Sequence, residues 1–170
     1  MALSFDRAGY ETVYCDLMFG LGIPIPLKGL TTLKRVARVL MPVVGRMPMS
    51  FIYPTGEKQR EIVPKYEKWY QWASVIAGDF NYIKRHLPHR LEAKVIVTNT
   101  TTAADVELLT ARGVRYLVTT TPRFQGRSFG TNVLEATLTA VAGKGRPLAA
   151  KEIEKLLEEL NFKPNITQLN

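Results

Sequence analysis

Two apolar runs that each end in threonines stand out in the pattern of hydrophobic and polar positions. The first covers residues 95–98 and the second covers residues 114–119. A helical pattern about one crossover long separates them; Thr102 is placed to cap it and Gly113 to close it. Because neighbouring parallel strands need such a crossover, the stretch from Lys94 to Val141 predicts a strand–helix–strand unit followed by a second helix.

A third strand is predicted from Ala73 to Ala77, where a compact apolar run leads into Gly78 and Asp79. The carboxyl ends of parallel strands meet at one sheet edge, where open α/β sheets bind their ligands. We therefore predict an α/β fold, a Rossmann-like three-layer sandwich with a mostly parallel sheet. Its ligand edge is formed by the strand exits at Gly78, Thr98 and Thr119.

The N-terminal pattern predicts a short helix from Met1 to Ala8, closed by Gly9, and then a strand from Tyr10 to Phe19. In a dinucleotide-binding domain a glycine-rich turn comes before such a helix, and an acid ends the next strand. Asp16 occupies the place of that acid, although a carboxylate there can also simply cap a neighbouring backbone group. No G-x-G-x-x-G occurs, so we expect a Rossmann-like domain that lacks its first strand and glycine turn.

A basic amphipathic pattern that starts at Leu30 predicts a helix ending near Pro42. Such a helix suits a membrane surface or a phosphate, or it is a surface helix with a solvated basic face. The second interpretation is favoured, because no tryptophan marks the helix as interfacial. A long loop over residues 45–63, around a short strand from Met49 to Tyr53, is expected to be a flap or an oligomer contact.

Further elements are predicted from shorter patterns. The helix from Pro64 to Trp72 has an aromatic face, which at helical spacing indicates core or interface residues more often than base stacking. The segment from Lys84 to Arg90 is predicted to be a solvated basic turn, and its two histidines lack a third ligand, so no metal site is expected. The amphipathic helix from Ala149 to Leu160 is expected to pack on the sheet or on a second subunit. The predicted main domain covers residues 1–146, and residues 147–170 form a C-terminal helix and tail.

The candidate binding groups gather around the predicted strand ends. Hydroxyls, an amide and backbone N–H groups at these turns suit the ribose and phosphate oxygens of a nucleotide cofactor. The predicted cofactor-binding residues are Asp16, Gly78, Asp79, Thr98, Asn99, Thr100, Thr119 and Thr120. Arg123 and Arg127, in a flexible loop after the last strand, are predicted to clamp a phosphate or carboxylate, the alternative being solvated surface charges. The hydroxyls, the Asn99 amide and the backbone N–H groups of the turn from Thr98 to Thr101 are not strong bases or nucleophiles, so they are interpreted as binding groups, and no catalytic residue is predicted.

Composition narrows the choice of function only a little. A chain of 170 residues with 46% hydrophobic residues suits one globular domain. The net charge of +8 and the pI near 9.7 favour an anionic partner, which is a nucleic acid, a membrane surface or a phosphate-bearing ligand. No nucleic-acid recognition motif occurs, so specific nucleic-acid binding is not expected.

Cysteine usage and hydropathy indicate where the protein works. The single cysteine, Cys15, excludes an intramolecular disulfide and favours a reducing, cytoplasmic setting. The apolar run from Leu17 to Leu27 is too short to span a bilayer and contains Pro24 and Pro26. No charged leader precedes an apolar signal core. We therefore expect a cytoplasmic protein with no membrane partner.

Four segments carry a resemblance to a known family. They are Cys15-Asp16-Leu17, Tyr53-Pro54-Thr55-Gly56-Glu57-Lys58, Val97-Thr98-Asn99-Thr100-Thr101-Thr102 and Arg127-Ser128-Phe129-Gly130-Thr131-Asn132. Through them the chain resembles, along nearly its whole length, a bacterial family labelled quinate or shikimate 5-dehydrogenase-like. Its relation to authentic shikimate dehydrogenases is distant and rests on the Rossmann-like pattern and the turn at residues 98–101.

The resemblance implies an NAD(P)-dependent oxidoreductase acting on a cyclic hydroxy acid, of which this chain is the cofactor-binding portion. Authentic shikimate dehydrogenases carry their catalytic lysine and aspartate in an N-terminal substrate domain, and no region of this chain matches that domain. NAD is favoured over NADP, because Asp16 suits the ribose hydroxyl. A homo-oligomer is expected. The alternative is a non-catalytic Rossmann-like domain that binds another nucleotide or an anionic metabolite.

Overall fold

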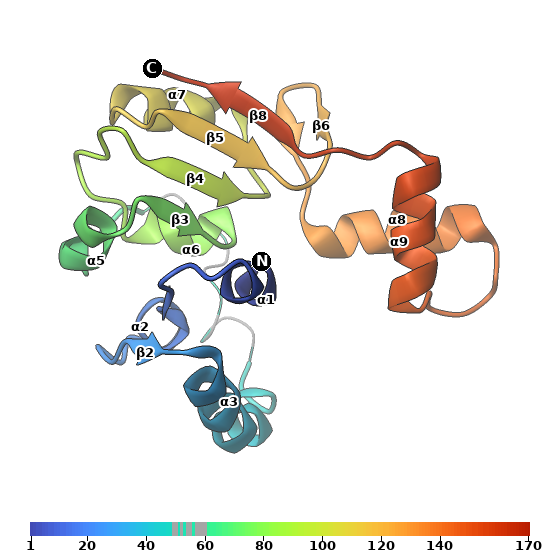
Figure 1. Cartoon of the computed structure of the whole chain (residues 1–170), viewed down its shortest axis with the longest axis horizontal. Helices are drawn as coiled ribbons and strands as arrows, with labels where there is room; N and C mark the ends of the chain where they lie inside the picture. Colours follow the sequence, from blue (N-terminus) through green and yellow to red (C-terminus); the bar gives the residue numbers. More distant parts are fainter. Residues whose placement is uncertain (49–50, 52, 54–55, 57–60) are drawn as a thin grey trace. The chain divides into compact units, whose positions relative to one another are not determined.

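The computed structural model describes residues 1–48, 51, 53, 56 and 61–170 (Figure 1). The chain divides into two compact units. Unit 1 comprises Met1–Trp72 with Asn81–Pro88, and unit 2 comprises Ala73–Phe80 with His89–Asn170. The boundary expected at residue 146 falls inside unit 2. The strand predicted from Met49 to Tyr53 lies largely outside the described residues.

Unit 2 is built on a four-stranded sheet in the order β3-β4-β5-β8. Its strands are β3 (Val75–Ala77), β4 (Val95–Thr98), β5 (Tyr116–Thr119) and β8 (Asn165–Gln168). The first three are parallel and β8 joins β5 antiparallel, so the sheet is mixed. The helix α7 (Ala103–Ala111) connects β4 to β5, which confirms the predicted strand–helix–strand unit.

The strand β8 was not predicted, because a run of one apolar residue among polar ones gives little strand signal. Tertiary contacts fix it instead. The Leu169 N–H donates to the Arg115 carbonyl at 2.9 Å, and the Asn170 side-chain amide donates to the carbonyls of Val114 at 2.9 Å and Thr110 at 3.1 Å. The tail is therefore anchored both to the edge of β5 and to the end of α7.

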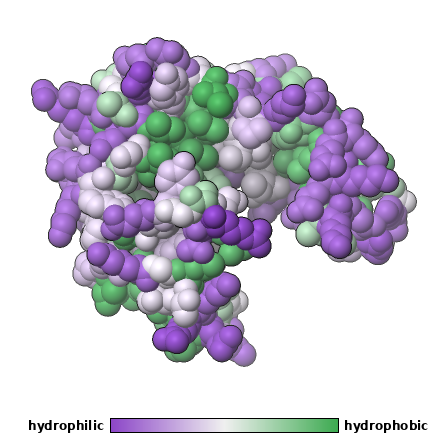
Figure 2. Space-filling model, in the orientation of Figure 1, coloured by the Kyte–Doolittle hydropathy of each residue, from purple (hydrophilic) through white to green (hydrophobic). Residues whose placement is uncertain are grey.

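The two faces of this sheet are buried to different extents. Ile96 and Leu117 lie side by side on one face and are fully buried, as is Leu109 of α7. On the other face Val97 and Val118 are only half-buried and their neighbour Ile166 is 69% exposed. Figure 2 shows apolar atoms gathered over the strands in this view. The predicted α/β class is thus present, whereas a third layer over the sheet is not seen within the described part of unit 2.

The start of α7 follows the predicted capping pattern. The Thr102 hydroxyl oxygen accepts the Asp105 N–H at 3.3 Å, while the Asp105 carboxylate accepts the Thr102 N–H at 2.9 Å. Two N–H groups that the helix cannot satisfy are therefore paired. Gly113 follows the end of the helix at φ 83°, and a Cβ there would lie 3.1 Å from the Glu92 side chain. The capping box uses the Thr102 hydroxyl, and the positive φ and close approach to Glu92 at position 113 suit glycine alone.

The segment after β5 is more regular than the predicted flexible loop. It forms a hairpin of β6 (Arg123–Phe124) and β7 (Arg127–Ser128), joined by Gln125 and Gly126 at positive φ. The hairpin was not predicted, because its strands are only two residues long, too short for a pattern of alternating polarity to show. The hairpin leads directly into α8 (Thr131–Ala142).

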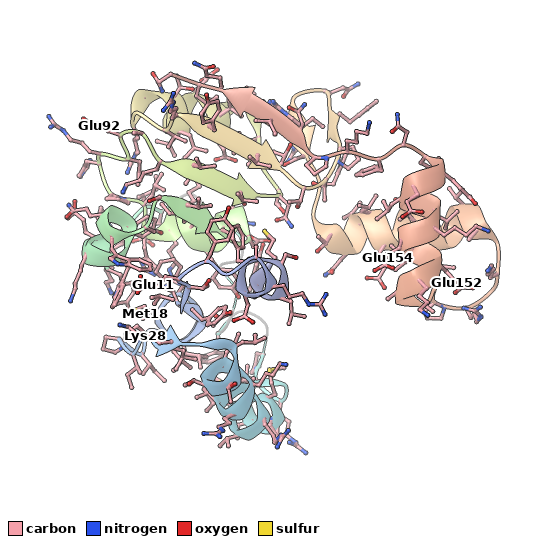
Figure 3. The ribbon with its side chains drawn as sticks, viewed as in Figure 1. Glu11, Met18, Lys28, Glu92, Glu152 and Glu154 are labelled. Atoms are coloured by element: carbon pink, nitrogen blue, oxygen red, sulfur yellow. The ribbon has the colours of Figure 1, made fainter. Side chains whose placement is uncertain are left out.

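α8 and α9 (Ala150–Glu159) were both predicted. Glu152 organises the connection between them: its carboxylate accepts hydrogen bonds from Arg146 at 2.8 Å, Lys144 at 2.6 Å and the Ala149 N–H at 2.8 Å. The hydrogen bonds from Arg146 and then Lys144 hold the pKa of Glu152 well below its usual range. Figure 3 shows Glu152 and Glu154 on opposite sides of α9, with Glu152 on the side of this connection.

Unit 1 is mainly helical. Its elements are α1 (Ala2–Arg7), β1 (Val13–Tyr14), α2 (Asp16–Leu21), β2 (Leu27–Lys28), α3 (Leu30–Val44), α5 (Glu67–Trp72) and α6 (Phe80–Arg85), whose first residue belongs to unit 2. The N-terminal helix, α3 and α5 were predicted, although Pro42 lies inside α3. The predicted strand from Tyr10 to Phe19 is present only as β1, because the chain becomes helical at Asp16 and stays so until Gly22 adopts a left-handed conformation. The apolar run from Leu17 to Leu27 therefore contains most of α2.

Two clusters hold unit 1 together. Tyr14, Leu17 and Leu27 form a buried core against which α3 packs its apolar stripe. In the second cluster, Phe19 stacks between Tyr66 and Tyr70, with ring centroids 5.8 and 5.7 Å away. The buried Tyr70 hydroxyl donates to the Ile83 carbonyl at 2.7 Å, so this ring belongs to the core, as its helical spacing predicted.

The segment predicted as a solvated basic turn is instead buried at its centre. His86 and Leu87 are buried, and the His86 Nδ1 lies 3.0 Å from the Val63 carbonyl oxygen. Since a carbonyl only accepts, Nδ1 carries the proton and donates it. Burial lowers the pKa of His86, and the Val63 hydrogen bond opposes this only in part. His86 therefore contributes to the fold as a neutral imidazole.

Replacing Thr102 with alanine should lower the free energy of unfolding by about 1 kcal/mol, the usual value of a helix N-cap. Urea unfolding followed by circular dichroism measures it. Thr137→Ala is the matched control, because the Thr137 hydroxyl is exposed and bonds only the Val133 carbonyl of its own helix. Equal losses in the two variants would show that the capping box does not stabilise α7.

Stability should fall as the pH drops below about 6.5, the pKa of an unperturbed histidine. The folded-state pKa of His86 is lowered, so the unfolded chain takes up the proton more readily and gains population in acid. We expect His86→Gln to flatten the dependence of unfolding free energy on pH between 6.5 and 5, and His89→Gln, which replaces an exposed histidine, is the matched control. A pH dependence that survives in His86→Gln would contradict this assignment.

Candidate functional site

The carboxyl ends of β3, β4 and β5 meet at one edge of the sheet. The Thr98 hydroxyl donates to the Gly78 carbonyl at 2.7 Å, and the Thr120 N–H donates to the Thr98 carbonyl at 3.0 Å. The exit of β4 is thus hydrogen-bonded to the exits of both neighbouring strands. This is the position at which open α/β sheets hold ligands.

Two of the threonines predicted to bind a cofactor have enclosed side chains. Thr98 is fully buried and its hydroxyl is used by Gly78. Thr119, its neighbour across the ladder, is also buried, and its hydroxyl has no hydrogen-bond partner among the described residues. The Thr98 hydroxyl therefore joins two strand exits and is not available to a ligand, and the residues that follow the two threonines, Asn99, Thr100 and Thr120, are less enclosed candidates for ligand contacts.

The turn after β4 has a conformation that the sequence does not favour. Thr100 has φ 59°, a left-handed value that a β-branched residue adopts at a cost of about 1–3 kcal/mol. Its hydroxyl donates to the Asn99 side-chain oxygen at 3.1 Å. Asn99 itself is only 5% exposed. Surrounding contacts must therefore impose this turn on the chain.

The contacts that impose it come from the end of the hairpin. The Ser128 hydroxyl accepts the Thr101 N–H at 2.8 Å and lies 2.7 Å from the Thr101 hydroxyl, while the Ser128 N–H donates to the Thr101 carbonyl at 2.8 Å. The Thr121 hydroxyl donates to the Phe129 carbonyl at 2.6 Å. We call this set of hydrogen bonds the serine latch. Sequence analysis missed Thr101 and Ser128 as a pair, and their only signal was that both lie in motifs shared with the resembled family.

The serine latch places the start of α8 beside the turn after β4. A Cβ built on Gly130, the residue that precedes α8, would lie 3.6 Å from the Thr100 hydroxyl. Gly130 has φ −68° and ψ 153°, and no side chain caps the helix. Helix starts leave backbone N–H groups without intrahelical partners. Those of Thr131 and Asn132 are thus carried to the ligand edge.

The two arginines of the hairpin differ in their surroundings. Arg123 is half-buried and donates to the Thr167 hydroxyl of β8 at 3.5 Å, a long contact. Arg127 is exposed and forms no hydrogen bond or ion pair within the described part of the chain. Of the pair predicted to clamp an anion, Arg127 has the guanidinium that is available to do so.

The two predicted aspartates lie in different units. Asp79 follows Gly78 directly after β3, at the sheet edge of unit 2. Asp16 is the first residue of α2 in unit 1, and the preceding strand β1 pairs only with β2. Asp16 therefore does not end a strand of the parallel sheet, and the geometric basis for placing it on a ribose was wrong. The cause is the helix that begins where a strand was expected.

Cys15 also has surroundings that limit its chemistry. Burial, followed by the charge of Asp16, raises the pKa of its thiol to about 11. The thiol therefore stays protonated near neutral pH and is a weak nucleophile. Across the described residues, no three His, Cys, Asp or Glu side chains are grouped so as to hold a metal ion. Likewise, no helix there is both long and apolar enough to cross a bilayer.

The fold and the site define an α/β protein whose parallel strands present hydroxyl, amide and backbone N–H groups at one sheet edge. The chain belongs to a family described as a domain of unknown function (DUF8754), whose model matches residues 1–169. No curated protein matches the chain, and no solved structure does.

Removing the Ser128 hydroxyl should lower the free energy of unfolding by about 1–3 kcal/mol, because the buried Thr101 N–H and hydroxyl lose their partner. Urea unfolding of Ser128→Ala measures the loss, and amide exchange at Thr101 should speed up. Thr120→Ala is the control on the same edge, since its hydroxyl makes only a 3.4 Å contact with the Thr98 carbonyl. If the two variants lose the same stability, the serine latch does not hold the edge.

Proposed function

We propose that the sheet edge of unit 2 binds NAD or NADP, and that the protein is the cofactor-binding portion of an oxidoreductase of the quinate/shikimate dehydrogenase type. The observation that carries this proposal is the convergence of three parallel strand exits with the start of α8. In doubly wound α/β proteins, dinucleotides bind at this kind of edge. The resemblance of the chain to quinate or shikimate 5-dehydrogenase-like proteins points to the same class.

The finer fold that we propose is a Rossmann-like domain in which another turn replaces the glycine-rich one. The segment from Asn99 to Thr102 occupies a strand-to-helix turn, where the glycine fingerprint normally holds a pyrophosphate. In this chain, side-chain hydroxyls and an amide would supply hydrogen bonds to the ligand. In the glycine-rich turn, backbone N–H groups that approach the pyrophosphate closely supply them. Ribose and phosphate oxygens are the ligand atoms that suit such a lining.

The residues of the edge support binding more than reaction. Threonine hydroxyls and an asparagine amide hold and orient a cofactor, and none of them is a general base at neutral pH. The cyclic hydroxy acid substrate would therefore meet its catalytic groups elsewhere. Since Asp16 does not end a parallel strand, the preference for NAD loses its basis, and Arg127 suits the 2′-phosphate of NADP.

Titration calorimetry with NAD and NADP tests this proposal. We expect saturable binding of at least one of them at sub-millimolar concentration, and a tenfold or greater weakening in Asn99→Asp, which keeps the shape of the side chain but replaces a donor with a negative charge. Asn161→Asp makes the same change in net charge at an exposed site after α9 and should bind like the wild type. Absence of binding of either dinucleotide at millimolar concentration would refute the proposal.

A second candidate is a non-catalytic domain that binds another nucleotide or an anionic metabolite. The threonine hydroxyls and the Asn99 amide, which are binding groups, and the net charge of +8 favour it. A thermal-shift screen separates the two candidates: a large stabilisation by another anion, with none by NAD(P), would support the second. Weak binding of nucleic acid that disappears with modest salt would reflect nonspecific attraction alone.

A further inference from the structure

The helix α3 exposes apolar side chains that the core of unit 1 does not use. Leu33, Val36 and Leu40 are half-buried where the helix packs on that core. Val39 is 73% exposed and Val43 is 63% exposed. These two valines lie one turn apart, and each follows a packing residue by three positions, so they border the packed stripe on the helix surface. The apolar face of α3 is therefore wider than the part of it that packs.

A basic side chain continues the row of exposed valines. Arg35 precedes Val39 by four residues, so Arg35, Val39 and Val43 follow one another along the same side of the helix. We call these three residues the outer strip. Arg35 is exposed and lines an open hollow together with Val36, Val39 and Leu40. A guanidinium in this position can contact an anionic group while its methylene stem stays on the apolar surface.

The charge around the outer strip has a single sign. No acidic residue occurs in the 40 residues between Asp16 and Glu57. The same stretch contains five basic residues, which are Lys28, Lys34, Arg35, Arg38 and Arg46. Lys34 and Arg38 belong to α3 and are exposed, as Arg35 is. The helix therefore presents a positive surface that no carboxylate of its own segment neutralises.

We propose that the outer strip docks α3 on an anionic lipid surface, with the helix axis parallel to that surface. The two valines enter the boundary between headgroups and acyl chains, and the basic residues attract the anionic headgroups. The sequence favoured a solvated basic face because no residue marked the helix as interfacial, and the exposed valines now supply such a mark. The helix lies on the surface and does not cross it, since its 15 residues are too few to span a bilayer.

Two other occupants fit the outer strip less well. A second copy of the chain in a two-fold contact would place Lys34, Arg35 and Arg38 against the same three cations, because such a contact uses one surface twice. A nucleic acid would pair with the cations but would leave the valines unused, because bases stack on aromatic rings and guanidinium planes. An anionic lipid surface uses the apolar side chains and the charge together.

Co-sedimentation of the full-length chain with lipid vesicles tests the proposal. We expect the protein to bind vesicles of phosphatidylcholine mixed with phosphatidylserine and not to bind vesicles of phosphatidylcholine alone. The affinity for the mixed vesicles should fall as salt is added, because salt screens the attraction between the basic residues and the headgroups. Absence of binding to the mixed vesicles at low salt would overturn the proposal.

Two substitutions in the outer strip separate its apolar part from its charged part. Val39→Ser should weaken binding to the mixed vesicles about tenfold, because less apolar surface leaves water. Val141→Ser is the matched control, since Val141 is 70% exposed on α8 of unit 2. Arg35→Gln should weaken binding about fivefold, the effect of one basic residue near a charged surface. Arg90→Gln replaces an exposed arginine of unit 2 and should bind like the wild type.

The remaining outcomes contradict the proposal in different ways. Equal affinities of Val39→Ser and Val141→Ser would show that the attraction is only that of a basic protein for an anionic surface. A dimer in sedimentation velocity that dissociates in Val39→Ser would assign the outer strip to a second copy. An oligonucleotide that binds more tightly than the vesicles, and is lost in Arg35→Gln, would assign it to nucleic acid. Binding of NAD or NADP affects none of these results, because the cofactor edge belongs to unit 2 and α3 to unit 1.

Discussion

The hydrogen bonds between Thr101 and Ser128 are the constraint on which the ligand edge depends. They join two segments that are far apart in sequence, the turn after β4 and the end of the β6–β7 hairpin. Because both partners are buried, either one left alone would have unsatisfied polar groups, so the two segments are stable only together. The left-handed backbone conformation of Thr100 and the position of Gly130 beside it depend on these hydrogen bonds. The edge is therefore a preformed structure and not a loose collection of threonines.

The threonines themselves divide into two roles. The hydroxyls of Thr98 and Thr121 donate hydrogen bonds to carbonyls of neighbouring segments. These carbonyls lie where the chain leaves the sheet, and without the hydroxyls they would need water as a partner. Asn99 and the residues at the start of α8 keep donors available. A sequence rich in threonine at strand ends is thus consistent with binding, but most of its hydroxyls support the few groups that can reach a ligand.

Local patterns account for the parts of the molecule that sequence could predict. The crossover from β4 to β5, the cap at Thr102 and the span of α3 each have a signal within one element. The hairpin and β8 have none, because the hairpin strands are two residues long and β8 has a single apolar residue among polar ones. Asp16 was misplaced because the β-branched and aromatic run predicts a strand as far as Phe19. The strand ends at Tyr14, and α2 begins at Asp16.

The candidate site was predicted in outline and missed in detail. The strand exits could be placed because parallel topology brings carboxyl ends together, whatever the side chains. Which hydroxyls are consumed, and which donors remain, depends on the contact of Thr101 with Ser128, and no spacing rule encodes a pairing between such distant positions. The contact of Arg123 with Thr167 of β8 also joins positions far apart in sequence.

The position of β8 also affects how the chain is made. β5 pairs with β4 through a short crossover, but its other edge is completed only by residues 165–168, after α8 and α9. During synthesis that edge stays open while both helices emerge, and an open strand edge can pair with another chain. Nascent chains held close together on one messenger would therefore be vulnerable to mispairing at this edge of β5 until β8 closes it.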